Sequence, residues 1–332
     1  MMLFARLSRV VFSVIALALL CSLADPAHAV TIDWVTVDDA GNAADITGYG
    51  AVAESFRIMK YEFTNQQYTD FLNTVAATDT YSLYNASMGG DATGGITRSG
   101  ASGSYTYAVK PNMGNKPATY LSWWDGARVA NWLMNGAAAS SSTETGAYTL
   151  NGAISGAAPT RNSGATCYIP TEDQWYMAAY YKGGSTNAGY WDYAAQSDTA
   201  PATVTALPNG DGSAGSTGNF ANYGSVVGNV TTVGTNGGPS AYGAFDMQGN
   251  MWEWNDLHGA PNSSRGLRGG DYYQGITTAN SRAEDNAASE YSGYGFRLAA
   301  PVAVPEPSTS CMALAGLACG GYSLFRRRRT LI

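Results

Sequence analysis

The amino-acid sequence predicts an α+β domain with a high share of irregular chain over residues 30–300. Three short segments carry helix start signals, whereas alternation of the strand type extends over only a few residues at a time. Between them lie stretches rich in Gly, Ser, Ala and Thr, which offer little apolar surface to bury and are expected to be surface loops. These stretches are residues 88–104, 136–166 and 183–218.

The N-terminus has the pattern of a secretory signal. Arg6 and Arg9 precede an apolar run over residues 10–20, and the small residues of 27–29 form a cleavage site. The apolar run has about 11 residues, too few to cross a hydrocarbon layer of about 30 Å. We therefore expect signal peptidase to remove residues 1–29. The bulky leucine before Cys21 argues against a lipoprotein site.

Three helices are expected to begin at N-cap hydroxyls. Each hydroxyl can accept a backbone N–H from the first turn, and a glutamine three residues later can also reach back to the N-cap amide. The pairs are Thr64 with Gln67, Ser122 with Asp125, and Thr171 with Gln174.

The helical segments have apolar faces. The first has one stripe, at i, i+3, i+4 and i+7, made of Tyr68, Phe71, Leu72 and Val75. In the second and third, large tryptophans stand beside small alanines, which predicts close packing of these helices against a sheet. Strand signals are shorter. Side chains alternate over residues 56–61, and a strand over 295–298 is expected to close the domain.

The C-terminal residues 301–332 contain three parts in order: a Pro-Glu-Pro element at 305–307, a mostly apolar stretch at 308–325, and four arginines at 326–329. This order resembles the PEP-CTERM sorting signal. A helix of about 18 residues can just span a bilayer, with the arginines holding its end on the cytoplasmic side. The alternative is an ordinary C-terminal transmembrane anchor.

The resemblance to PEP-CTERM proteins implies a route and a partner. An exosortase-like protease would cleave near the Pro-Glu-Pro element. The protein would then be exported, anchored transiently in the inner membrane through its C-terminal helix, and transferred to the outer surface or the extracellular matrix.

The composition of the exported body restricts its chemistry. Residues 30–300 hold 12 basic and 23 acidic side chains, a net charge of −11, which argues against a nucleic-acid partner and suits calcium. Cys167 is the single cysteine of this body and His258 its single histidine. An intramolecular disulfide and metal sites that need a cysteine pair or several histidines are therefore excluded. Cys167 is expected to fill the core, and nothing beyond residue type supports a Ser/His/Asp triad at His258.

Six segments of the body resemble, in order, the motifs of the formylglycine-generating enzyme, or sulfatase-modifying factor, family. The resemblance spans nearly the whole exported body and implies a loop-rich, C-type-lectin-like fold. The segments are KYEFTNQQYTDFLN at 60–73, KPATYLSWWDGARVANWL at 116–133, YIPTEDQWYMAA at 168–179, AYGAFDMQGNMWEW at 241–254, LRGG at 267–270 and GFRLA at 295–299.

The same resemblance shows which ligands this chain lacks. Formylglycine-generating members bind copper through two cysteines shortly after the RGG motif, whereas residues 271–279 of this chain contain none, and Gln274 and Ala279 cannot replace soft thiolates. Iron-dependent relatives use a histidine cluster that is also absent. No copper or iron is therefore expected.

By resemblance, the loop before the WEW sequence holds a structural calcium ion. Asp246 would supply a side-chain oxygen, and Gly249, Met251 and Glu253 would supply backbone carbonyls; Asn222 and Tyr223 would contribute to a second ion. Oxygen donors on a flexible loop suit Ca²⁺ better than Mg²⁺. The alternative is that Asp246 caps a turn and Glu253 pairs with an arginine.

Two pairs of side chains allow both a functional and a structural interpretation. Trp252 and Trp254 fit a sugar-stacking pair, but alternating tryptophans in a family motif favour core packing. Arg268 and Arg297 fit an anion clamp, but their glycine neighbours favour tying loops to buried carbonyls or to Glu62.

The segment 271–294 is the candidate ligand-binding loop, because it combines Tyr272, Tyr273, Tyr291 and Tyr294 with small polar residues. The alternative is an ordinary solvated loop. Three functions follow for the whole chain: a calcium-stabilised binding or structural module that contacts exopolysaccharide or another surface protein, an oxidoreductase of the family with altered metal chemistry, and a scaffold without a small ligand.

Overall fold

A computed structural model of the chain describes residues 30–257, 260–276 and 281–302. The predicted signal peptide and the predicted membrane-spanning segment 308–325 lie outside these residues, as does His258. Among the residues described, no helix is long and apolar enough to cross a membrane. The chain divides into a unit that ends at Ala300 and a second unit from Pro301 onward, and the fold below is that of the first.

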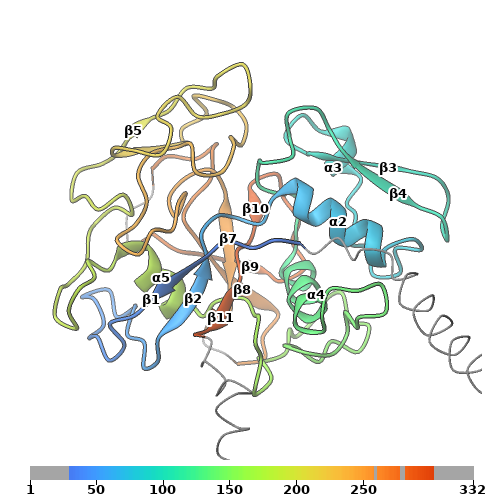
Figure 1. Ribbon diagram of the computed structural model, residues 1–332, viewed down its shortest axis with the longest axis horizontal. Helices are drawn as coiled ribbons and strands as arrows, with labels where there is room; N and C mark the ends of the chain where they lie inside the picture. Colours follow the sequence, from blue (N-terminus) through green and yellow to red (C-terminus); the bar gives the residue numbers. More distant parts are fainter. Residues whose placement is uncertain (1–29, 258–259, 277–280, 303–332) are drawn as a thin grey trace, which may run out of the picture. The chain divides into compact units, whose positions relative to one another are not determined.

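A four-stranded sheet with the order β10-β7-β8-β9 lies at the centre of this unit (Figure 1). β7 (Trp252–Asn255) pairs in parallel with β10 (Tyr294–Gly295) and antiparallel with β8 (Ser264–Arg268), which pairs antiparallel with β9 (Ala283–Asn286). All four residues of β7 are buried, because strands flank it on both sides and helices and loops cover it. The WEW sequence is therefore the middle of the fold.

A second sheet with the order β1-β2-β11 joins the two ends of the unit. It contains β1 (Trp34–Val37), β2 (Phe56–Met59) and β11 (Ala299–Pro301). The strand predicted over 56–61 is confirmed as β2, which ends at Met59; Met59 is buried as well as Phe56 and Ile58, so the alternation of burial does not hold throughout.

The predicted strand over 295–298 is wrong, because the chain changes sheets there: β10 ends at Gly295 and β11 begins at Ala299. Phe296 and Leu298 in between accept backbone hydrogen bonds from the N–H groups of Phe63 and Met59, at 3.0 and 2.9 Å.

The three predicted helices are confirmed as α2 (Asn65–Val75), α4 (Trp123–Met134) and α5 (Glu172–Tyr180), each with a complete capping box. Asp125 also reaches back, accepting the Ser122 backbone N–H at 2.8 Å, which the sequence analysis assigned only to the glutamines. α2 and α4 lie on one side of the central sheet and α5 lies on the other (Figure 1).

The predicted loop over 88–104 is wrong in part. It contains the end of α3 (Ser87–Gly90) and β3 (Ile96–Ser99), which forms a hairpin with β4 (Thr106–Val109). The apolar side chains of Ile96 and Tyr107 anchor this hairpin, with 0% and 5% of their surface exposed. The predicted loop over 183–218 contains only β5 (Ala202–Thr203), paired with β6 (Phe220–Ala221), and residues 136–166 contain no helix or strand.

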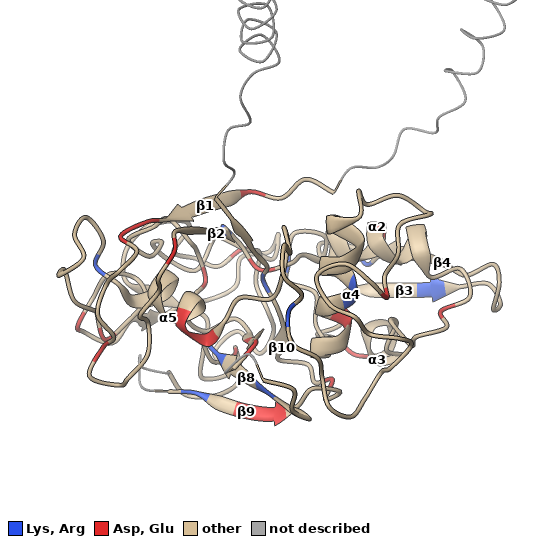
Figure 2. Ribbon diagram, turned by 90° about the horizontal axis from the view of Figure 1, so that it is seen from below, with Lys and Arg blue, Asp and Glu red and all other residues tan. Residues whose placement is uncertain are grey.

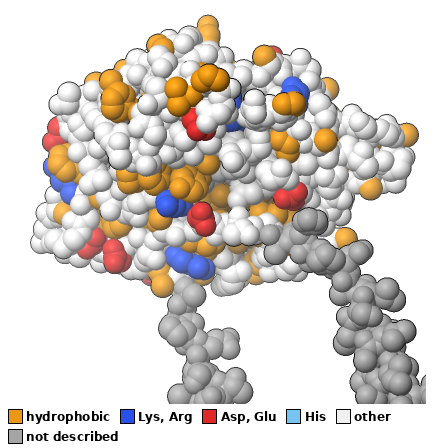
Figure 3. Space-filling view, turned by 45° about the horizontal axis from the view of Figure 1, so that its top comes forward, with side chains coloured by type: hydrophobic (Ala, Val, Ile, Leu, Met, Phe, Trp, Pro, Cys, Tyr) orange, Lys and Arg blue, Asp and Glu red, His pale blue; other side chains and the backbone are white. Residues whose placement is uncertain are grey.

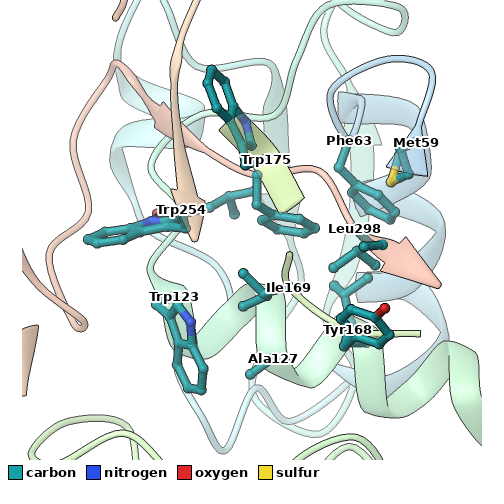
Figure 4. Packing of buried hydrophobic residues seen from close by; sticks show 14 of the residues in the cluster. Met59, Phe63, Trp123, Ala127, Tyr168, Ile169, Trp175, Trp254 and Leu298 are labelled. Atoms are coloured by element: carbon teal, nitrogen blue, oxygen red, sulfur yellow. Dashed lines mark hydrogen bonds between the residues drawn. The ribbon is translucent and has the colours of Figure 1, made fainter. Parts of the chain in front are cut away.

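Aromatic side chains from α2, α4, α5 and β7 meet in one core (Figure 4). Trp123 of α4, Trp175 of α5 and Trp254 of β7 have no exposed surface. The Trp254 indole N–H donates to the Leu121 carbonyl at 2.8 Å, so its polar atom is satisfied inside the core. With Trp252 only 6% exposed, the core interpretation of this tryptophan pair is confirmed.

Candidate functional site

The segment after the RGG motif is built on a buried carboxylate. Asp271, 8% exposed, accepts the backbone N–H groups of Tyr273 and Gln274 at 3.1 and 2.8 Å. Burial raises the pKa of this carboxyl group above its ordinary value, and these hydrogen bonds oppose the shift. The Gln274 carbonyl in turn accepts the Gly224 N–H at 2.7 Å. Ala279, the other position compared with the copper ligands, lies outside the described residues.

The four predicted ligand-binding tyrosines fall into two groups. Tyr273 and Tyr291 are 68% and 57% exposed. Tyr272 is buried, and its hydroxyl bonds to the Ser292 hydroxyl at 3.1 Å, which ties the two halves of the segment together. We call the exposed rings of Tyr273 and Tyr291 the tyrosine surface.

Tyr294 supports this surface from below. Its ring makes edge contacts with Trp254 at 5.3 Å and with Tyr291 at 5.1 Å between ring centroids. Its hydroxyl donates to Asp285 at 3.0 Å. Because Trp254 belongs to the core, Tyr291 packs, through Tyr294, on a fixed part of the structure rather than on a free loop.

Three carboxylates surround one guanidinium group behind the WEW strand. Glu62, Glu253 and Arg297 have no exposed surface, and Asp246 is partly buried. Arg297 donates to Glu253 at 2.6 Å, and to the carbonyl of Phe245 at 2.9 Å. The structural interpretation of Arg297 as a group that ties loops to buried carbonyls is confirmed. We call these four residues the acidic cluster.

Glu62 is the least satisfied member of the acidic cluster. Its Oε1 accepts the Asn250 side-chain amide at 3.0 Å, whereas its buried Oε2 has no hydrogen-bond partner among the described residues. Burial, and then the charge of Asp246, raise the pKa of Glu62 well above its ordinary value. Arg297 opposes this shift.

The predicted calcium ligands are brought close together by backbone contacts. The Asn250 N–H donates to the Asn222 carbonyl at 2.8 Å, and the Gly249 N–H donates to the Gly269 carbonyl at 2.9 Å. The side-chain Oδ1 of Asn222 is buried without a hydrogen-bond partner among the described residues. The Tyr223 hydroxyl points elsewhere and donates to the Pro201 carbonyl at 2.8 Å.

Asp246 adopts a left-handed backbone conformation, with φ of 55°. Its carboxylate accepts the Asn236 amide at 2.9 Å and the Gly234 N–H. Burial raises the pKa of Asp246, and these hydrogen bonds oppose the shift. Glu253 lies in β7, where its side chain is held by Arg297 and by the Trp175 indole N–H at 2.7 Å.

Arg268 and a neighbour that the sequence analysis missed are held by one carboxylate. Glu172 at the start of α5 contacts Arg268 at 2.7 Å and Arg282 at 2.9 Å. Figure 2 shows the acidic start of α5 beside the basic end of β8. Both guanidinium groups also lie near the Tyr49 ring, at 4.6 and 5.6 Å. Arg268 therefore joins β8 to α5. The sequence offered one signal for this contact, namely the acidic residues in the first turn of α5.

Cys167 is 6% exposed, and burial raises the pKa of its thiol to about 12. A thiol of this kind is almost entirely protonated at neutral pH and is a poor nucleophile. The prediction that Cys167 fills the core is confirmed.

The fold and the site define a loop-rich α+β domain whose polar sites present oxygen atoms and tyrosine rings. Residues 45–302 match the Sulfatase-modifying factor enzyme 1-like domain, and because this match covers more than half of the chain, the chain belongs to that family. Residues 303–329 match the PEP-CTERM protein-sorting motif, which points to an exported, surface-sorted protein processed by an exosortase-type system.

The fold is similar to that of a solved structure, CarF. CarF is 23% identical, with 82% of this chain and 100% of that chain covered and a TM-score of 0.52. Variable protein 1 of Treponema denticola is 17% identical, covering 83% and 97%, at a TM-score of 0.48. PvdO from Pseudomonas aeruginosa is 16% identical, covering 82% and 92%, at 0.40. No curated protein matches the chain.

Proposed function

We propose that this chain is a non-catalytic binding module of the cell surface, stabilised by calcium, which contacts exopolysaccharide or another surface protein through its tyrosine surface. One observation carries the proposal: Tyr273 and Tyr291 are exposed, yet the backbone that carries them is held by hydrogen bonds to Asp271 and Ser292 and by packing on the core. Rigid, exposed tyrosines supply contact area at a low cost in conformational entropy.

The chemistry of the segment after RGG supports binding rather than oxidation. The family's copper chemistry, as the resemblance implies it, needs two thiolates there, and the sequence provides none. Asp271 and Gln274 are instead engaged in backbone hydrogen bonds that hold the segment in place.

A calcium ion fits the donors around the loop that precedes β7. A Cβ atom added at Gly269 would lie 3.5 Å from the carbonyl oxygens of both Met247 and Met251, so the two oxygens face one small space. The Asp246 carboxylate accepts two hydrogen bonds and has further lone pairs available. The unpartnered Oδ1 of Asn222 would serve the second ion. Carbonyl, amide and carboxylate oxygens are the donors that Ca²⁺ takes.

The proposed ion would be weakly held. Among the described residues, no group of three or more Asp, Glu, His or Cys side chains is arranged to hold a metal ion. The donors would thus carry little charge. Calcium affinity decreases as the number of charged ligands decreases. We expect a Kd on the order of 10⁻⁴–10⁻³ M, the range of extracellular calcium modules.

The binding proposal is tested with the exported protein on a glycan array and in pull-downs from the cell-surface fraction of its own source. A Tyr273→Ser, Tyr291→Ser double variant should lose the captured ligand. Leu207→Ser, which removes a 45% exposed side chain elsewhere, should keep it. Equal capture by all three proteins would rule out the tyrosine surface, and no capture by any would favour a scaffold without a ligand.

Copper and iron analysis of the same preparation, with oxygen uptake on a cysteine peptide of the sulfatase type, tests the oxidoreductase alternative. We expect neither stoichiometric metal nor uptake. Turnover would overturn the non-catalytic proposal.

A further inference from the structure

Three neighbouring cavities of about 210, 500 and 380 Å³ lie beside the first turn of α2. Asp33 and Tyr61 line both the first and the second cavity, and Asn115 and Thr232 line both the second and the third. Because neighbouring cavities share these lining residues, we treat the three as parts of one groove, which we call the polar groove. The second and third cavities each fall within the range of pockets that hold small organic ligands.

The side chains of the polar groove are mostly uncharged hydrogen-bonding groups. Asn112 and Asn115 are exposed, and among the described residues their amides have no hydrogen-bond partner. Each amide can donate two hydrogen bonds and accept two. Thr232 lines the same end of the groove, as does Asn209, whose amide already donates to Asp211 at 2.6 Å. A ligand whose groups both donate and accept, as sugar hydroxyls do, matches this set.

An aromatic ring forms part of the wall at the other end. The Tyr61 ring stacks on Phe245 with 5.5 Å between centroids. Behind it the backbone of Gly234, at φ of 76°, is so close that an added Cβ would lie 2.6 Å from the ring. Packing on both neighbours fixes the ring, and a fixed aromatic wall next to hydrogen-bonding groups suits the apolar face of a sugar ring.

The carboxylates of the groove outnumber its cations and select against acidic ligands. Asp33, Asp70 and Asp211 line it, as does the fully buried Glu62. The Lys60 ammonium lies 5.3 Å from the centre of the Tyr61 ring. Lys116 packs against Gly210 and is 8% exposed. The negative charge of Asp211 interacts with its ammonium group. Like charges facing an anionic chain would repel it. Figure 3 shows one face of the molecule, on which acidic and basic side chains occur only in small, scattered groups.

We propose that the polar groove binds a single strand of polysaccharide whose sugars are uncharged, and that it rejects chains of uronic acids. This site is separate from the tyrosine surface and shares no residue with it. The groove contacts several sugars in a row, with Tyr61 beneath one ring and Asn115 bonding to the hydroxyls of the next.

The test measures binding of three hexasaccharide probes to the exported protein by calorimetry: cellohexaose, the hexamer of N-acetylglucosamine, and hexagalacturonate. At least one uncharged probe should bind, and hexagalacturonate should bind at least tenfold more weakly. Asn115→Ala and Tyr61→Leu should each weaken the uncharged probe at least fivefold. Asn187→Ala, at an exposed asparagine outside the groove, should change the Kd less than twofold.

Two further variants separate this proposal from the binding role of the tyrosine surface. Asp33→Asn removes one groove charge and should reduce the discrimination against hexagalacturonate, a readout that loss of folding does not mimic. Binding that is lost in Tyr273→Ser, Tyr291→Ser but unchanged in Asn115→Ala and Tyr61→Leu would overturn the groove and leave the proposed function standing. Tight binding of hexagalacturonate, or no binding of either uncharged probe, would also overturn it.

Discussion

At the scale of single residues, burial decides what each charged side chain does. Arg297 has no exposed surface and neutralises only part of the charge of Glu62, Asp246 and Glu253. Arg98 also forms an ion pair, with Asp79 at 3.0 Å, but 29% of its side chain is exposed. Water reaches the Arg98 guanidinium, although the Asp79 side chain is only 4% exposed, whereas neither partner of the Arg297–Glu253 pair is exposed to water.

Replacing Arg297 tests this difference. Arg297→Met leaves Glu253 buried without its cation, so the free energy of unfolding should fall by about 3–5 kcal/mol. The control Arg98→Met should cost no more than about 1 kcal/mol. Urea denaturation of both variants measures the two losses. Similar losses would contradict the assignment of Arg297 as a structural group.

Asp256 gives the fold a pH dependence. It is 3% exposed and lies 3.0 Å from the Nε of Arg265, without the alignment of a hydrogen bond. Burial, opposed by Arg265, raises the pKa of Asp256 to about 6. The folded protein therefore binds this proton more tightly than the unfolded chain, whose Asp pKa is about 3.9. The contribution of Asp256 to stability falls as the pH rises from about 4 to about 6.

An Asp256→Asn variant should remove that dependence. Between pH 4 and pH 7 the wild-type protein should lose about 2–3 kcal/mol of stability relative to the variant, since one pKa unit corresponds to about 1.4 kcal/mol. Urea melts of both proteins across this pH range give the difference. Parallel pH curves would show that the pKa of Asp256 is ordinary.

At the scale of secondary structure, capping boxes determine where the helices begin. The boxes of α2, α4 and α5 consist of local side-chain to backbone contacts, which is why the sequence located all three. The box of α4 is the most buried, with Ser122 and Asp125 at 3% and 2% exposure. Its loss leaves a buried N–H without a partner.

Ser122→Ala should lower the free energy of unfolding by about 1–2 kcal/mol, at the upper end for N-caps. Thr64→Ala, in a cap that is half exposed, should cost about 1 kcal/mol or less. Ser216→Ala on the exposed surface should change stability by at most about 0.5 kcal/mol. The order of the three urea midpoints checks the prediction. A Ser122→Ala protein as stable as Ser216→Ala would contradict it.

At the scale of the whole molecule, calcium is expected to act as a ligand of the folded state. At a concentration of 10 times Kd, an ion bound only by the folded protein adds about 1.4 kcal/mol, following RT ln(1 + [L]/Kd). For a domain of this size that corresponds to about 3–5 °C in Tm. Thermal melts in 10 mM calcium and in chelator measure the shift, and an Asp246→Ala variant should show less of it. An unchanged Tm in chelator would remove the calcium proposal.

The sequence by itself located the three capped helices, the core tryptophans and the inert Cys167, because each depends on local spacing or on residue type. It misplaced the strand at 295–298 and missed the hairpin over 96–109, because strands are defined by partners far along the chain.

Only the tertiary structure decided which polar groups face one another. It showed that Tyr273 and Tyr291 are exposed, Tyr294 partly buried and Tyr272 buried. It also placed Glu62 beside Asp246 although 184 positions separate them. It also brought Tyr61, Asn115 and Asp211 to one groove. Local sequence carries no record of such contacts, because they arise when loops from distant segments pack around a common core.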